Sequence, residues 1–331
     1  MATVQKMLSP EEIATQSPAQ VPHLRLPDRR YVFAARAERL RSLAGGHTMA
    51  DFLLFAAKVA DQQQKMLDEI SGVMLPKAEL LAQCREHGMP PLNPQTLPRE
   101  QVWCDMLRRM LRALADETEG PLKARIIKLE GERDVLYEAQ ASKLLAGIMF
   151  GLDLGDAPLI AAALQVYWTH LATTLGVEEF PALDVPNLCP CCGQRPVASI
   201  TRIGAQESGF RFLHCGLCAA EWHMVRIKCA ACDSTKGIHY QSIDDGRPGT
   251  QHAVKAECCD ECDSYLKIVY QDRDPHVDPV ADDLATLALD LMVSDELGKT
   301  SFGVNLMLLH GPGNDGDGSN PGDNIRDDGG G

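Results

Sequence analysis

The chain has 331 residues, 45% of them apolar, and a formal net charge of -14 at pH 7. This length allows two domains, and no run approaches the roughly 20 apolar residues that a membrane span requires. The acidic balance disfavours a nucleic-acid-binding protein. Residues 1–18 lack the apolar stretch of a secretory signal, so we expect a cytoplasmic protein without membrane insertion.

The first part of the chain, residues 1–180, is expected to form an all-helical domain. Helical segments are expected at 28–44, 48–70, 77–89, 102–114, 122–150 with a break near Gly131, and 158–175. In 102–114, for example, apolar residues recur at the three- and four-residue spacing of one helix face. Cys84 and Cys104 lie in these helices and are expected to be buried and inert. Residues 181–188, which contain two prolines, are interpreted as a linker.

Four Cys-x-x-Cys pairs follow the linker. They are Cys189/Cys192, Cys215/Cys218, Cys229/Cys232 and Cys259/Cys262. Such a pair forms a knuckle that points two thiolates at one metal ion, and two knuckles complete a tetrahedral site. The eight cysteines therefore predict two metal ions, each bound by four cysteines. Such a closed site has no open position for a substrate, which favours a scaffold, a recognition module or an electron carrier over an enzyme that uses a metal for hydrolysis.

The segments between the knuckles predict how the pairs combine. Extended runs at 197–203 and 210–213 form one expected hairpin, and runs at 238–243 and 252–256 form another. These hairpins favour tandem pairing, with one rubredoxin-like or zinc-ribbon module at 189–228 and a second at 229–275. Cross-braced pairing is the alternative. Cys191 and Cys258 are interpreted as additional cysteines that do not bind the metal.

The residue after each knuckle is expected to adopt a positive φ, which lets backbone N–H groups turn toward the thiolates. Gly193 suits this position well, Asp233 and Asp263 suit it moderately, and Ala219 suits it least.

The surroundings of the knuckles add three expectations. Residues 186–274 contain ten Lys and Arg against eleven Asp and Glu, so the ribbons are expected to repel nucleic-acid backbones. His214 and His223 flank the second knuckle, but as ligands they would leave a cysteine of a complete set unused, so neither is expected to bind metal. Trp222 either packs beneath the ribbon or contacts a partner.

After the ribbons the chain becomes helical again. In 276–310 a C-terminal helix at 282–292 is expected to pack back on the core, with residues 284, 287, 288, 291 and 292 on one face. Residues 311–331 are rich in glycine and aspartate and are expected to form a disordered acidic tail.

Three stretches of the sequence resemble the formate dehydrogenase accessory protein family, FdhE. The first runs from Arg211 to Cys229 and includes Cys215, Cys218 and the segment Glu221-Trp222-His223. The second is Lys255–Lys267 around the fourth knuckle, and the third is the helix that begins at Asp282. The resemblance is specific from about 186 to 295, and the helical first half agrees with the family in type.

The resemblance implies a cytoplasmic assembly factor that is needed for active respiratory formate dehydrogenase and that binds its catalytic subunit. It favours rubredoxin-like iron in the two sites, although tetrahedral four-thiolate coordination suits zinc equally well. The segment Glu221-Trp222-His223 is a candidate partner contact. In the alternative, the irons are redox-active and the protein donates electrons or senses oxygen during maturation. The sequence also leaves self-association open.

Overall fold

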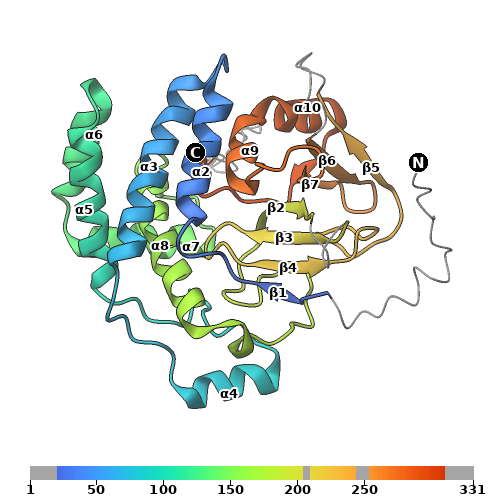
Figure 1. Ribbon diagram of the computed structural model, residues 1–331, viewed down its shortest axis with the longest axis horizontal. Coiled ribbons are helices and arrows are strands. Elements are labelled where there is room, and N and C mark those ends of the chain that lie inside the picture. Colours follow the sequence, from blue (N-terminus) through green and yellow to red (C-terminus); the bar gives the residue numbers. More distant parts are fainter. Residues whose placement is uncertain (1–20, 204–208, 244–252, 310–331) are drawn as a thin grey trace, which may run out of the picture.

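The computed structural model of the protein describes residues 21–203, 209–243 and 253–309. The expected acidic tail, residues 1–20 of the expected helical domain and the turns of both expected hairpins lie outside these ranges. A group of helices lies beside one mixed β-sheet, and the last two helices lie near the upper end of that sheet in Figure 1. The expected fold class, a helical region followed by a small β region with two four-cysteine clusters, is confirmed.

The helices of the first half occupy the expected segments. They are α2 (Val32–Ala44), α3 (Ala50–Glu69), α4 (Ala78–His87), α5 (Val102–Asp116), α6 (Gly120–Glu130), α7 (Asp134–Ala146) and α8 (Ala157–Leu175), followed by a short 3-10 turn, η2 (Val177–Glu179). The chain breaks at Gly131 as predicted, and Gly131 N–H donates to the carbonyl of Ile127 at the end of α6. On α5 the predicted apolar stripe, including Met106 and Met110, is buried.

Helix α8 is the centre of the helical layer. Every residue from Leu159 to Ala172 is buried, because the helix packs against α3, α5 and α7 and also faces the sheet region. Its alanines at 161–163 let neighbouring helices approach closely. An almost completely apolar helix of this kind is stable only inside a core. No helix within the described ranges is long and apolar enough to cross a membrane.

The strands form a single sheet. They are β1 (Leu24–Arg25), β2 (Pro196–Thr201), β3 (Arg211–Cys215), β4 (Glu221–Met224), β5 (Ile238–Gln241), β6 (Val254–Cys259), β7 (Ser264–Tyr270) and β8 (Thr300–Ser301). Their order is β1-β4-β3-β2-β7-β6-β5, with β8 beside β7. Strands β2–β3 and β5–β6 are the two predicted hairpins, and both are antiparallel.

The two ribbons are joined more closely than the sequence suggests. Strand β2 of the first ribbon pairs in parallel with β7 of the second, with Ser199 opposite Ile268. Strand β1, from the region expected to be all-helical, pairs with β4 and places Leu24 opposite Trp222. A two-residue strand carries no alternating pattern, and sheet pairing between distant segments leaves no local signal, so neither feature was predicted.

The C-terminal helix differs from the prediction. It is divided at Thr286 into α9 (Pro279–Ala285) and α10 (Leu287–Leu297). Helix α9 begins at Asp278, whose side chain accepts hydrogen bonds from two backbone N–H groups of the first turn. The division rotates the second half, so Leu289 and Val293 are buried while Leu291 is 63% exposed. The predicted face was therefore wrong beyond residue 284.

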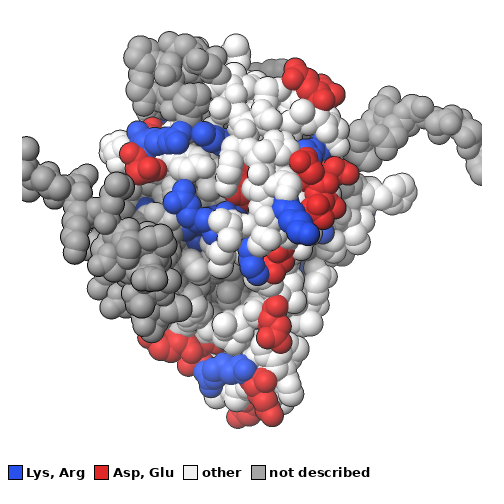
Figure 2. Space-filling model, turned by 90° about the vertical axis from the view of Figure 1, so that its right-hand side faces the viewer, with Lys and Arg blue, Asp and Glu red and all other residues white. Residues whose placement is uncertain are grey.

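Buried charges hold the C-terminal helices in place. Arg39 of α2 forms ion pairs with Asp274 and Asp282, and Arg36 pairs with Asp278. Lys267 on β7 is almost completely buried and donates to the carbonyl oxygen of Asp283, 2.8 Å away. On the face shown in Figure 2, basic and acidic side chains are interspersed.

Candidate metal centres

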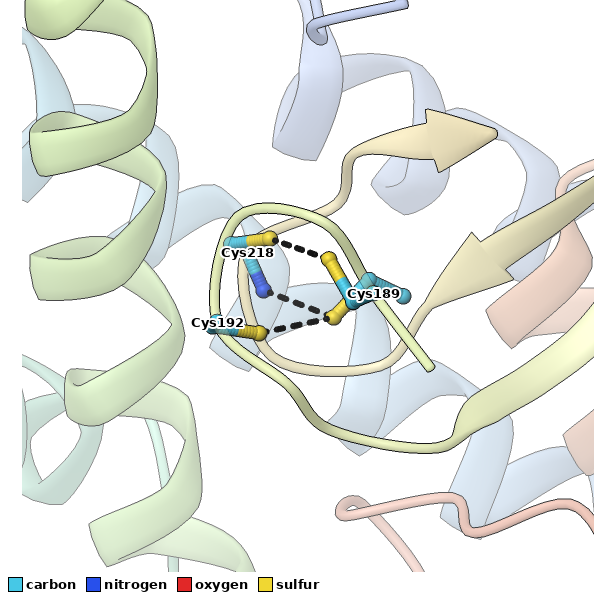
Figure 3. Close-up of side chains that lie close together, drawn as sticks. Cys189, Cys192 and Cys218 are labelled. Carbon is cyan, nitrogen blue, oxygen red and sulfur yellow. Dashed lines mark hydrogen bonds between the residues drawn. The ribbon is translucent and has the colours of Figure 1, made fainter. Parts of the chain in front are cut away.

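The first and second knuckles meet in one buried cluster, here called site 1. Cys189 and Cys192 precede β2, Cys215 is the last residue of β3, and Cys218 lies in the turn before β4. The Sγ atoms of Cys189 and Cys218 are 3.5 Å apart, and those of Cys192 and Cys215 are 3.4 Å apart. Figure 3 shows three of these side chains pointing toward one another. All four cysteines are buried.

The third and fourth knuckles form site 2. Cys229 and Cys232 follow β4, Cys259 ends β6, and Cys262 lies in the turn before β7. The Sγ atoms of Cys229 and Cys262 are 3.8 Å apart, as are those of Cys232 and Cys259. Cys232 and Cys262 are exposed. The structure thus brings the knuckles together in the tandem pairing and not in the cross-braced alternative.

The backbone of each knuckle explains why these sequences form this turn. The residues after the knuckles have φ values of 73° at Gly193, 58° at Ala219, 60° at Asp233 and 50° at Asp263. The N–H groups of Gly193, Ala219 and Asp233 close the turn by donating to the carbonyl of the first cysteine of their knuckle. N–H groups inside the knuckle donate to the sulfur of the first cysteine, as Cys218 N–H does to Cys215 Sγ at 3.5 Å and Ala231 N–H to Cys229 Sγ at 3.4 Å. Even the alanine, which suits the position least, adopts the positive φ.

The sulfur positions fit a tetrahedral metal ion. With a metal–sulfur bond of about 2.3 Å, the edge of a tetrahedron of sulfurs is about 3.8 Å. The measured Sγ separations of 3.4–3.8 Å agree with this value, and in each site all four Sγ atoms lie within 4.8 Å of one another. Each cluster could therefore hold one ion, and a four-thiolate set suits both zinc and rubredoxin-type iron.

The electrostatics of site 1 also favour a cation. Burial raises the pKa of the Cys192 and Cys218 thiols well above the ordinary thiol value, since a buried thiolate without a counterion is costly. A divalent ion reverses this balance, because a coordinating thiol loses its proton to the metal bond.

The helical layer clamps site 1. Gln165 of α8 donates through Nε2 to the carbonyl of Gly216, in the second knuckle, at 2.7 Å. Leu92 N–H donates to the carbonyl of Cys191, in the first knuckle, at 2.9 Å. Trp168 Nε1 in turn donates to the carbonyl of Leu92 at 2.8 Å. Both knuckles of site 1 are thus fixed by hydrogen bonds from the N-terminal half.

The histidines beside the second knuckle lie outside the sulfur clusters. His214 Nδ1 is 3.1 Å from Glu221 Oε1, and Arg202 also pairs with that carboxylate. Burial alone would raise the pKa of Glu221, but Arg202 and the hydrogen bond from His214 lower it to about 2. His223 lies between the rings of Phe210 and Phe212, with centroids 5.8 and 5.9 Å away.

The candidate partner contact is mostly inside the protein. Trp222 is only 3% exposed, and its Nε1–H donates to the carbonyl of Pro186 at 2.8 Å. Glu221 is buried as well, so His223 is the one residue of the three with a partly exposed side chain. Of the two interpretations of Trp222, the structure favours packing beneath the ribbon. The hydrogen bond to Pro186 also anchors the expected linker to β4.

The four remaining cysteines lie outside both sets of four. Burial raises the pKa of Cys104 to about 12 and of Cys258 to about 11, and it raises the pKa of Cys84 as well. Cys191 is completely buried inside the first knuckle. Thiols held in the protonated form are poor nucleophiles, which agrees with the inert role expected for Cys84 and Cys104.

One residue that supports site 2 was missed. Lys299, distant in sequence, is buried and donates through Nζ to the carbonyl of Cys259 at 3.0 Å and to Asp260 Oδ1 at 2.7 Å. It braces the fourth knuckle from behind. The sequence offers no signal for this role, because a single lysine after a helix is usually a solvated surface residue.

Comparison with known proteins agrees with this architecture. Family models described as "FdhE, N-terminal", "FdhE, central domain" and "FdhE, C-terminal domain" match residues 21–181, 188–226 and 227–308. The chain belongs to the FdhE family. It is 39% identical to "Protein FdhE" of Escherichia coli K12 and 38% identical to "Protein FdhE" of Salmonella dublin. Each alignment covers 88% of this chain and 93% of the relative.

A solved structure of the family shares the fold. "The crystal structure of the FdhE protein from Pseudomonas aeruginosa" superposes with a TM-score of 0.78 at 38% sequence identity. The match covers 88% of this chain and 100% of the solved chain. The predicted family resemblance is therefore confirmed over nearly the whole length of the relatives.

Proposed function

We propose that this FdhE-family protein is a cytoplasmic assembly factor that binds the catalytic subunit of respiratory formate dehydrogenase and is required for its activity. One metal ion is held by each set of four cysteines. The proposal rests on the observation that each cluster has four cysteines, the full number of ligands of a tetrahedral ion. An ion bound by all four has no open coordination position for a substrate. Such ions shape a surface, and we propose no turnover by the protein itself.

Family membership supports the link to formate dehydrogenase, because the accessory role is what the resemblance implies. Iron is the favoured metal on the same ground, with zinc as the alternative. The partner surface is proposed to lie where the two sites approach each other along the chain, between β4 and the third knuckle. Here Val225 is 45% exposed and Ile227 is 67% exposed, whereas Trp222 is buried.

This segment follows residues 221–223, of which Glu221 and Trp222 are buried. Exposed apolar side chains on a short segment that precedes a knuckle are held in a fixed position, so little entropy is lost on binding. A partner can contact them without disturbing either cysteine cluster. His223, in the strand β4 that precedes this segment, can contribute a polar contact.

The test is co-purification of the catalytic subunit from cells that respire formate. Ile227→Asp should reduce the captured subunit and lower formate dehydrogenase activity, while metal content and melting temperature stay unchanged. Val135→Asp on α7, which alters a similarly exposed apolar residue elsewhere, is the control and should bind normally. Equal capture by both variants and the unmodified protein would move the contact away from this segment. Failure to capture any formate dehydrogenase subunit would contradict the proposed function.

A second function is favoured by one observation. Cys232 and Cys262 place site 2 at the surface, where an electron could pass between a bound iron and a partner. In this alternative the protein is a rubredoxin-like donor or oxygen sensor during maturation. Optical spectra separate the two cases, since ferric iron in a four-thiolate site is coloured and zinc is not. A colour that bleaches reversibly on reduction, together with oxygen-dependent loss of function, would favour the redox role.

A further inference from the structure

The two metal sites have the same ligands but different surroundings. In site 1 all four cysteines are buried, while in site 2 Cys232 and Cys262 are exposed. A ligand sulfur that touches solvent can be approached by an incoming ligand, and a buried one cannot. Two sites with the same ligands therefore differ in their access to solvent.

The residues inside the knuckles strengthen the contrast. The knuckles of site 1 contain or are followed by uncharged residues, namely Pro190, Cys191, Gly193, Gly216, Leu217 and Ala219. Those of site 2 contain or are followed by exposed Asp233, Asp260, Glu261 and Asp263. Lys228 pairs with Asp233, and the Nζ atom of Lys299 lies 2.7 Å from Asp260 and 3.7 Å from Asp263. The four acids therefore exceed these two lysines by two negative charges. This charge lies where a cation would approach.

Site 1 is also anchored more firmly to the rest of the protein than site 2. An ion can leave site 1 only if the knuckles part from α8 and from the loop around Leu92, which requires opening of the main core. Site 2 is braced on its inner side, by Lys299 behind Cys259 and by Asn187 Nδ2 donating to the carbonyl of Ala231 at 3.0 Å. The two exposed cysteines, Cys232 and Cys262, lie on the solvent side of site 2.

We infer that site 2 is the exchangeable metal site of this protein and that site 1 is locked. Soft divalent cations, Zn²⁺ or Fe²⁺, enter and leave site 2 past Cys232 and Cys262, drawn by Asp263 and Glu261. The exchange is a ligand substitution without electron transfer: the lone pair of an incoming donor binds the metal as a thiolate releases it. The inference rests on the proposed binding of two metal ions, one for each set of four cysteines.

The experiment follows metal release from the full-length protein loaded with two equivalents of Zn²⁺, using an excess of a chromogenic chelator. One equivalent should leave at least roughly tenfold faster than the other. Cys232→Ser should remove the fast equivalent and leave the slow one. Release of both equivalents at one rate, or a fast equivalent that persists in Cys232→Ser, would overturn the inference.

A second measurement avoids any variant that fails to fold. After the fast equivalent has left, the unmodified protein is treated with iodoacetamide and the modified cysteines are mapped by mass spectrometry. Cys232 and Cys262 should be modified first and Cys189 and Cys218 last. Earlier modification of the site 1 cysteines contradicts the inference.

The charged rim is tested through uptake. Glu261→Gln with Asp263→Asn should slow Zn²⁺ uptake into the fast site by roughly two- to fivefold, an effect that salt diminishes. Asp51→Asn on α3 removes an exposed acid elsewhere and should leave uptake unchanged. If the double variant takes up Zn²⁺ as fast as the unmodified protein, Glu261 and Asp263 do not attract the ion.

Stoichiometry separates this inference from the proposed function. A protein that cannot bind two ions contradicts the two-site assembly factor. Because the inference rests on two bound ions, that outcome contradicts the inference as well, whereas two bound ions that leave at one rate overturn the inference alone.

Discussion

Single residues at the knuckle exits adopt a backbone conformation that their side chains disfavour. Ala219 has a φ of 58°, a region that costs a residue with a Cβ about 1–2 kcal/mol. It nevertheless adopts this conformation, as do Asp233 and Asp263, and the N–H groups of Ala219 and Asp233 close the turn on the carbonyl of the first cysteine of their knuckle. The geometry of the knuckle turn therefore outweighs the preference of these residues for a negative φ.

Ala219→Gly should therefore stabilise the protein. The gain from relieving the left-handed alanine is partly offset by the extra freedom of glycine in the unfolded chain, which leaves about 0.5–1 kcal/mol. Denaturant unfolding of the metal-loaded protein measures the change. Ala220→Gly, one residue later, where φ is not positive, is the matched control and should destabilise. Destabilisation by both variants would show that Ala219 is not strained.

Trp222 should behave as a core residue. Trp222→Ala should lower the free energy of unfolding by about 3–5 kcal/mol, because it leaves a large cavity between β4 and the linker. Trp222→Phe retains most of the packing but loses the hydrogen bond to Pro186, and we expect a smaller loss of about 1–2 kcal/mol. A stable Trp222→Ala variant that fails only in binding would restore the partner-contact interpretation.

His170 should make stability depend on pH. Its burial in α8, with a contribution from Arg29, lowers its pKa to about 4, while the unfolded chain titrates near 6.5. The neutral form is favoured on folding, so this stability is fully present above pH 6.5 and is lost as pH falls toward 4. The loss should be about 2–3 kcal/mol.

The measurement compares unfolding of the unmodified protein and His170→Asn at several pH values. The asparagine can still accept the hydrogen bond from Arg29 but does not titrate. The difference between the two proteins should shrink as the pH is lowered from 7 to 4. Because both proteins carry the same cysteine clusters, acid loss of metal affects them equally. A constant difference over this range would contradict the prediction.

Among the elements, α8 connects the helical layer to the metal chemistry. Its buried Gln165 receives a hydrogen bond from Gln63 and donates one to Gly216 in the second knuckle of site 1. These two hydrogen bonds connect α3, through Gln63, to the second knuckle. The packing of the helices therefore fixes the position of that knuckle.

Gln165→Ala should weaken that connection. Loss of the amide removes the partner of the Gly216 carbonyl and of one N–H of Gln63 Nε2, which still donates to the carbonyl of Ala162, at a cost of about 2–3 kcal/mol. Metal retention at site 1 should fall, seen as faster release of the slow equivalent, while the fast equivalent is unaffected. Gln83→Ala, an exposed position on α4, is the control and should change neither quantity.

At the scale of the whole molecule, the two cysteine clusters share one sheet but contribute differently to the stability of the protein. The β2–β7 pairing joins the ribbons, and the cysteines of site 1 belong to the main hydrophobic core, whereas Cys229, Cys232, Cys259 and Cys262 of site 2 do not. Removing metal from the first cluster therefore affects the core that supports all other elements.

Cys192→Ser should lower the melting temperature more than Cys232→Ser. Each variant loses part of a metal-binding free energy on the order of 10 kcal/mol, but only the first loss lies within the main core. Thermal unfolding with metal analysis of both variants gives the comparison. Equal shifts, or full metal content with normal melting in both, would show that the two sites do not divide in this way.

The sequence by itself determined the two four-cysteine clusters and most of the helices. The spacing of eight cysteines, the hairpins between them and the turn residues are local features. They predicted the knuckles and favoured the tandem pairing over the cross-braced one, and the structure has the tandem pairing. The helix stripes are equally local, which is why α5 and the break at Gly131 were predicted.

Only the tertiary structure decided which side chains are buried and which distant residues support the cysteine clusters. Trp222 is buried because β1 and the linker cover it, Lys299 supports Cys259 from 40 residues away, and Thr286 divides a helix whose pattern was compatible with one face. The same holds for the difference between the two sites, since burial depends on which elements pack over a cluster. Contacts between distant segments are fixed by packing and leave no periodic trace in the sequence.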